Sequence, residues 1–148
     1  MMKSVCLAVA AVAVLSAPAL ADSSCGSPPI APAIPGAADL SGKTVEAGRA
    51  VVVDAYHQVK AYQAALKPYR DCLAAQESNL KQQIAAEETS GDKDAKDKVA
   101  AFTQQAQNAI DAQNKTVDTE GQVANDFNTL HTAQCVKDTD PKICPKKP

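Results

Sequence analysis

The residues best suited to chemistry are the histidines and cysteines, and the closest useful spacing among them joins His131 to Cys135. These two lie four positions apart, so on a helix they share one face. Imidazole nitrogen and thiolate sulfur are ligands that Zn²⁺ prefers, but a zinc site needs three or four protein ligands. No third ligand stands beside this pair, and a disulfide is the better use of Cys135. The sequence therefore predicts no metal site.

Catalytic groups are equally hard to assemble. A nucleophile needs a base within hydrogen-bonding reach, and no Ser, Cys or Asp is arranged in this way around His57 or His131. Asn114-Lys115-Thr116 has the form of an N-glycosylation acceptor, but it falls inside a predicted helix of a chain whose leader and composition look bacterial. We predict no catalytic residues and no cofactor, with both histidines facing solvent or the edge of the core.

The first 21 residues have the form of a secretory signal peptide. Lys3 precedes an apolar run from Val5 to Leu15, and Ala19-Leu20-Ala21 is a small-residue cleavage site. The run is too short to span a bilayer, and the residues before Cys25 do not form a lipidation motif. We expect cleavage after Ala21 and a protein of the periplasm or the exterior with no stable membrane anchor.

Two long helices must position the remaining cysteines. One column of apolar residues recurs every seven positions, which indicates a helix with a single apolar seam over about 44 to 88. Its members are Val45, Val52, Val59, Leu66, Leu73 and Leu80. A second helix is expected over about 95 to 134, and the polar residues 89 to 92 leave room only for a tight reversal. The predicted fold is all-α, a long antiparallel two-helix hairpin that resembles a coiled coil.

The hairpin implies a register, because paired residues on antiparallel helices have numbers that add to a constant. A constant near 183 places apolar residues opposite apolar residues, and it sets Tyr62 on Gly121, whose missing side chain makes room for the ring. The predicted pairs are Leu73 with Ile110, Leu66 with Val117, Val59 with Ala124 and Tyr56 with Phe127. Pro68 costs about 3 kcal/mol inside a helix. We expect one kinked helix there, with a three-helix arrangement as the alternative.

The chain divides into four segments. Residues 1–21 are the signal peptide, and residues 22–43 are rich in Pro and Gly and should form an extended strap against the hairpin. Residues 44–134 form the helical hairpin, which begins at a Thr44 N-cap, and residues 135–148 form a disulfide-closed tail. Because a two-helix seam makes a thin core, the fold needs disulfides.

Four cysteines remain after the leader, which allows three pairings. In the predicted register Cys72 lies opposite about Asp111, so Cys135 is about 36 Å away along the other helix and cannot reach it. Pairing Cys72 with Cys144 asks nine tail residues to cover the same distance and is marginal. For Cys25 to pair with Cys72, the strap must run back about 42 Å along the first helix. Its residues can reach about 59 Å, so this pairing fits. We predict that Cys25 joins Cys72 and that Cys135 joins Cys144.

One stretch of the chain resembles short exported helical proteins of proteobacteria. The shared pattern is a cysteine and proline-rich lead, Cys25-Gly26-Ser27-Pro28-Pro29, followed by a helix that contains Tyr69-Arg70-Asp71-Cys72-Leu73. The resemblance covers about residues 25 to 77. That group has no assigned activity, so the resemblance implies the disulfide and the periplasm and gives no chemistry.

Function can be predicted only as a class. The net charge of −2 argues against a nucleic-acid partner. We expect a non-enzymatic structural or protein-interaction module, which binds an unknown protein or self-associates through the Gln-rich and Ala-rich outer faces of its helices. The alternative is a holdase-like chaperone or an inhibitor, which would need an exposed apolar face. An enzyme is the weakest option, because a two-helix rod offers no deep pocket.

Overall fold

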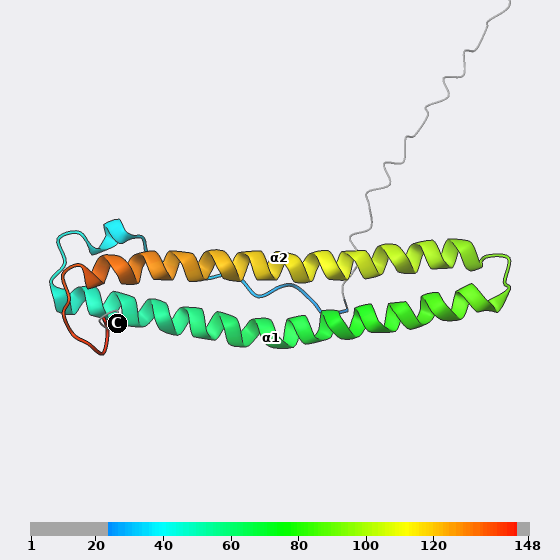
Figure 1. Ribbon diagram of the computed structural model, residues 1–148, viewed down its shortest axis with the longest axis horizontal. Coiled ribbons are helices and arrows are strands. Elements are labelled where there is room, and N and C mark those ends of the chain that lie inside the picture. Colours follow the sequence, from blue (N-terminus) through cyan, green and yellow to red (C-terminus); the bar gives the residue numbers. More distant parts are fainter. Residues whose placement is uncertain (1–23, 145–148) are drawn as a thin grey trace, which may run out of the picture.

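The computed structural model describes residues 24–144, and every regular element in this range is helical. A short 3-10 helix, η1 (Ala37–Leu40), is followed by α1 (Val45–Ser90) and α2 (Ala95–Cys135). The two long helices lie side by side and antiparallel along the length of a rod (Figure 1). The predicted all-α hairpin is confirmed. The predicted signal peptide, with Cys6, lies outside the described residues.

Both ends of α1 follow from local sequence. The Thr44 hydroxyl accepts a hydrogen bond from the Ala47 amide at 3.2 Å, which satisfies one of the free amides of the first turn. Gly91 ends the helix in the left-handed conformation with φ of 71°, which costs glycine little because it has no Cβ. The reversal into α2 then takes only residues 92 to 94.

Pro68 does not divide α1. The helix is continuous from Val45 to Ser90 with Pro68 exposed inside it, so the three-helix alternative is wrong. Figure 1 shows α1 bowed, with its middle furthest from α2. Because a proline removes one backbone hydrogen bond, a bow at this place is its expected effect.

The buried seam contains several columns of residues seven positions apart. In α1 these are Val52, Val59, Leu66, Leu73 and Leu80, interleaved with Ala55, Tyr62 and Tyr69. In α2 the main column is Ala109, Thr116, Val123 and Leu130. A spacing of seven on both helices is the pattern of a coiled-coil interface.

The predicted register is wrong by one residue. Val52 shares a cluster with Leu130, and Val59 shares one with Val123, so the paired numbers add to 182. One residue turns a helix by about 100°. The predicted partner of Leu66 is therefore turned outward: Val117 is 55% exposed, while the neighbouring Thr116 is 4% exposed.

The predicted role of Gly121 is wrong for the same reason. Gly121 is exposed, and a Cβ built there would meet no atom within 4 Å. The ring of Tyr62 packs instead with Leu66 and Val123, and Pro29 of the strap lies beside it. The strap, not a missing side chain, accommodates this ring.

A polar cluster bridges the middle of the seam. Arg70 donates one hydrogen bond to the Thr116 hydroxyl and another to the Glu120 carboxylate, each at 2.7 Å. Gln63 donates to the same carboxylate at 3.0 Å. These bonds from α1 satisfy the polar groups of α2 and explain how Thr116 can occupy a core position.

The strap lies along the groove between the two helices (Figure 1). Residues 24–36 have no regular structure, and Ala31 and Ile34 pack against the clusters of the seam. The prediction of an extended strap over 22–43 is wrong at η1, which is a short helix. There the Asp39 carboxylate accepts a hydrogen bond from the Gly36 amide at 2.8 Å, and the turn brings Leu40 into the core with 2% exposure.

Two disulfides hold the strap and the tail. Cys25 joins Cys72 with a Cα separation of 5.7 Å, and Cys135 joins Cys144 with a Cα separation of 5.4 Å. This is the predicted pairing. The first disulfide fixes the start of the strap to α1, and the second folds the tail back onto the last turn of α2.

The observed register leads to a test by paired substitutions. Leu66→Asp and Val123→Asp each place a charge in the seam and should lower the free energy of unfolding by about 3 kcal/mol or more. Val117→Asp should change it by no more than about 0.5 kcal/mol, because its side chain faces solvent. Thermal melts of the three variants make the comparison. A Val117→Asp variant as unstable as Val123→Asp would contradict the register.

Candidate functional site

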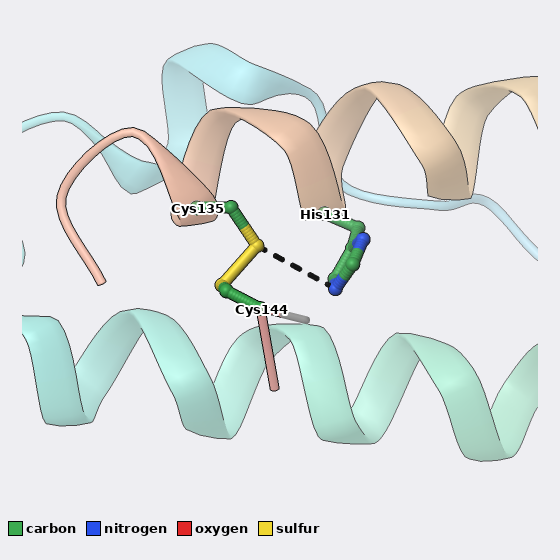
Figure 2. Close-up of side chains that lie close together, drawn as sticks. All are labelled: His131, Cys135 and Cys144. Atoms are coloured by element: carbon green, nitrogen blue, oxygen red, sulfur yellow. Dashed lines mark hydrogen bonds between the residues drawn. A yellow bond between two sulfur atoms is a disulfide. The ribbon is translucent and has the colours of Figure 1, made fainter. Parts of the chain in front are cut away.

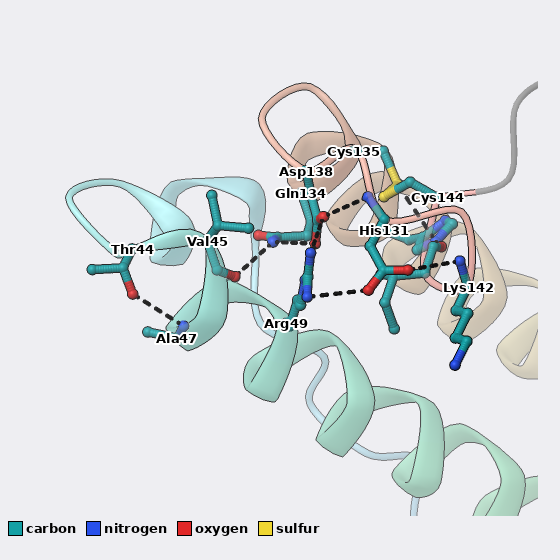
Figure 3. A network of polar contacts seen from close by, with 12 residues as sticks. Thr44, Val45, Ala47, Arg49, His131, Gln134, Cys135, Asp138, Lys142 and Cys144 are labelled. Atoms are coloured by element: carbon teal, nitrogen blue, oxygen red, sulfur yellow. Dashed lines mark hydrogen bonds and ion pairs between the residues drawn. A yellow bond between two sulfur atoms is a disulfide. The ribbon is translucent and has the colours of Figure 1, made fainter.

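The chemistry-bearing residues gather at one end of the rod, which we call the capped end. It comprises the first turns of α1, the last turns of α2 and tail residues 136–144 (Figure 3). Two polar groups meet there: an ion pair that ties the tail to α1, and a histidine beside a disulfide. An open hollow lies next to the second group.

The ion pair joins Arg49 of α1 to Asp138 of the tail. Arg49 Nε and Nη2 donate to the two carboxylate oxygens at 2.5 and 2.7 Å, and Nη1 lies 3.1 Å from Asp140 Oδ2. The Asp138 side chain is fully buried. Hydrogen bonding from Arg49 holds the pKa of Asp138 far below its usual range, and the same bond raises the pKa of Arg49. Bidentate pairing of this kind fixes orientation as well as charge.

Gln134 completes this cap from α2. It is fully buried, and its amide donates to the Val45 carbonyl at 2.9 Å and to Asp138 at 3.2 Å. The amide lies directly over Gly48, where a Cβ would come within 2.0 Å of Gln134 Oε1. Gly48 is therefore the helix-interior glycine that a close approach requires. This close approach was not predicted, because its one signal in the sequence is a glycine in phase with the apolar seam.

His131 lies against the second disulfide (Figure 2). Its Nε2 is 3.6 Å from Cys135 Sγ and 2.6 Å from the carbonyl oxygen of Ile143. Because a carbonyl can only accept, the ring must carry its hydrogen on Nε2 and donate it. The ring is stacked on Phe127 at a centroid distance of 5.9 Å and an interplanar angle of 12°, which fixes its orientation.

A third residue of a kind that can bind a metal lies beside His131 and Cys135, although none was predicted there. Cys144 is brought there by the tail, and the ligand atoms of all three lie within 4.8 Å of one another. Its position nine residues after Cys135, across Asp140-Pro141, was the available signal. Both sulfurs are bonded to each other here. A disulfide sulfur is not a thiolate, so this oxidised form offers zinc a single good ligand.

An open hollow of about 380 Å³ adjoins the histidine. Its wall is formed by residues of α1, α2 and the tail: Val52, Val53, Tyr56, Phe127, His131, Lys142 and Ile143. The predicted contact of Tyr56 with Phe127 is present, with ring centroids 6.1 Å apart. Tyr56 is nevertheless 48% exposed, and Val53 is 40% exposed. Such a surface can accept an apolar group and offers one cation, Lys142, at its edge.

The second histidine takes no part in this site. His57 lies on the exposed side of α1, and its ring meets Tyr56 edge to face at 5.9 Å. The structure therefore brings His131 together with two cysteines and leaves His57 apart from them. Both histidines lie where the sequence analysis expected them, at an edge of the seam or in solvent.

Comparison of the chain with known protein families, curated proteins and solved structures finds no match. Among the helices of residues 24–144, none has the length and apolar character needed to cross a membrane. Disulfides persist in oxidising compartments, so the two disulfides are compatible with a location outside the cytoplasm.

The two helix-interior glycines allow a matched test of the cap. Gly48→Ala should lower the free energy of unfolding by about 1 to 3 kcal/mol, because the new methyl group displaces the Gln134 amide from its buried hydrogen bonds. Gly121→Ala should raise it by about 0.5 to 1 kcal/mol, because alanine is the better helix former and its methyl group meets nothing. Denaturant unfolding measures both. Equal stabilisation by the two substitutions would contradict the close approach at Gly48.

Proposed function

We propose that the protein is a non-enzymatic interaction module of the periplasm, which binds a partner protein at the hollow of the capped end. The observation that carries this proposal is the exposure of Val53 and Tyr56 beside Phe127 in one concave surface. Most other large apolar side chains of the rod are buried in the seam. Tyrosine is among the residues most often found as the anchor of a protein interface.

The chemistry of the hollow favours one kind of partner. Its floor accepts an apolar or aromatic side chain, and Lys142 stands at its edge. Within residues 24–144 no carboxylate forms an ion pair with the Lys142 ammonium, whereas Arg49 is engaged by Asp138 and Asp140. The partner is therefore a protein segment with an apolar side chain next to an acidic residue.

The periplasmic location is supported by the leader and by the disulfides. Residues 1–21 carry the charge, apolar run and cleavage motif of a signal peptide. Two disulfides join all four cysteines of the described chain. A binding role also agrees with the histidines, since the Nε2 hydrogen of His131 is used on a carbonyl and His57 stands apart.

The proposal is tested by capturing the partner and then perturbing the hollow. The mature protein is used as bait in periplasmic extract, and the proteins that it retains are purified and titrated against variants. Val53→Glu and Lys142→Glu should each weaken binding at least about tenfold, because loss of an interface hot spot costs about 2 kcal/mol or more and about 1.4 kcal/mol is a tenfold change in affinity. Val117→Glu is the matched control, since Val117 is an exposed valine away from the hollow.

Three outcomes decide the proposal. A partner whose affinity falls with Val53→Glu and is unchanged with Val117→Glu supports it. A partner that is insensitive to both hollow variants contradicts the assigned surface. Retention of many unrelated denatured proteins, with suppression of their aggregation, would replace the interaction module by the holdase-like chaperone.

A further inference from the structure

The two disulfides differ in the polar group that lies beside one sulfur of each, Cys25 Sγ in the first and Cys135 Sγ in the second. Cys25 Sγ lies 3.7 Å from Gln76 Oε1, an oxygen acceptor, and Cys25 packs against the apolar cluster of Tyr69 and Leu73. Cys135 Sγ lies 3.6 Å from His131 Nε2, which carries a hydrogen. A donor stabilises a thiolate, while an acceptor and apolar surroundings do not. The surroundings therefore favour breaking the Cys135–Cys144 bond.

We propose that the Cys135–Cys144 disulfide is a site of thiol–disulfide exchange with a dithiol, and that His131 stabilises Cys135 as the leaving thiolate. The first thiolate of the dithiol attacks Cys144 Sγ and forms a mixed disulfide. The bond to Cys135 breaks, its electron pair remains on Cys135 Sγ, and His131 Nε2 donates its hydrogen bond to that sulfur.

The second half of the reaction consumes the same dithiol. The second thiol of the dithiol loses a proton to water. The resulting thiolate attacks the other sulfur of the same dithiol, which is bonded to Cys144 in the mixed disulfide. The dithiol leaves as a disulfide, and Cys144 is released as a thiolate that takes a proton from water. Two electrons pass from the dithiol to the cysteine pair, so the dithiol is oxidised and the protein is reduced.

The Nε2 hydrogen of His131 can change its acceptor when the disulfide breaks. In the oxidised form Nε2 donates to the carbonyl of Ile143, the residue immediately before Cys144. Breaking the disulfide releases Cys144 from α2 and allows Ile143 to move with it. The Nε2 hydrogen then turns to Cys135 Sγ, while the stack on Phe127 keeps the ring in position. A neutral imidazole suffices for this donation.

The charges around the sulfurs make His131 necessary. Cys135 is the last residue of α2, where the negative end of the helix dipole opposes a thiolate. The carboxylates of Asp138 and Asp140 are nearby, but both pair with Arg49. Lys142 lines the same hollow as His131 and adds a favourable charge.

Opening this disulfide would change the hollow that it borders. Lys142 and Ile143 form its tail wall, and both belong to the segment that Cys144 anchors. Arg49 holds the tail at Asp138 and Asp140, so the part of the tail that the disulfide can free begins after Asp140. The Ile143 and Cys144 amides donate to the Asp140 carbonyl at 3.1 and 2.7 Å, so a movement of this part must also open that turn. The exchange itself does not depend on the proposed binding role.

The experiment uses the whole mature protein in dithiothreitol, with free thiols trapped by alkylation and located by peptide mass spectrometry. Cys135 and Cys144 should become reduced at least about tenfold faster than Cys25 and Cys72. The equilibrium should also favour their reduction by about tenfold, which is about 30 mV for this two-electron couple. Equal rates for the two disulfides would overturn the proposal.

Variants of His131 separate donation from packing. His131→Phe keeps a ring beside Phe127 but loses the hydrogen, and it should slow reduction of the Cys135–Cys144 bond by about tenfold without affecting the other disulfide. His131→Gln retains an N–H donor and should recover part of the rate. A folded His131→Phe variant that is reduced as fast as the native protein would overturn the role of His131.

A second measurement remains decisive if His131→Phe fails to fold. In the Cys144→Ser variant of the mature protein, which begins after Ala21 and so lacks Cys6, Cys135 is the one cysteine outside a disulfide. Its ionisation can be followed by the ultraviolet absorbance of the thiolate. The proposal expects a pKa below the ordinary cysteine value of about 8.5. A pKa at or above that value would overturn it.

Discussion

The register of the two helices is the constraint on which the rest of the structure depends. Each helix presents only a narrow apolar column, so a shift of one residue would turn that column away from its partner. Most of the cross-helix contacts follow from this alignment. It places Gln134 over Gly48, Arg70 beside Thr116, and Val52 beside Leu130. The strap then packs along the two helices, and the disulfides hold the strap and the tail to the rod.

Much of this arrangement could be predicted from the sequence because its causes are local or arise from chain length. The spacing of seven predicts α1, Thr44 marks its start, and the reach of the strap identifies Cys25 as the partner of Cys72. The facing side of α2 could not be predicted in the same way. At the middle of α2 the wrong side looks the more apolar, because Ile110 and Val117 stand beside Ala109 and Thr116, which take the buried positions. Thr116 enters the core with its hydroxyl hydrogen-bonded to Arg70. That bond depends on a contact between distant parts of the chain.

At the capped end, too, the candidate site depends on contacts between distant parts of the chain, which no local pattern predicts. His131 and Cys135 are visible as a helical pair, but the tail brings Cys144 to them, and the tail is held by an ion pair between residues 89 positions apart. No local pattern marks Arg49 or Asp138 as partners. The hollow arises there because Tyr56 and Phe127 lie at the edge of the seam, where the tail covers them only in part. Binding and exchange chemistry thus share one end of the rod.

The most direct measurement of this account is the set of methyl contacts across the seam, observed by nuclear Overhauser effects in the folded mature protein. The register predicts contacts from Val59 to Val123 and from Val52 to Leu130. It also predicts that the methyl groups of Val117 show no contact with Leu66, since Val117 faces solvent. Contacts from Leu66 to Val117 and from Val59 to Ala124 would contradict it, and with it the alignment that builds the capped end.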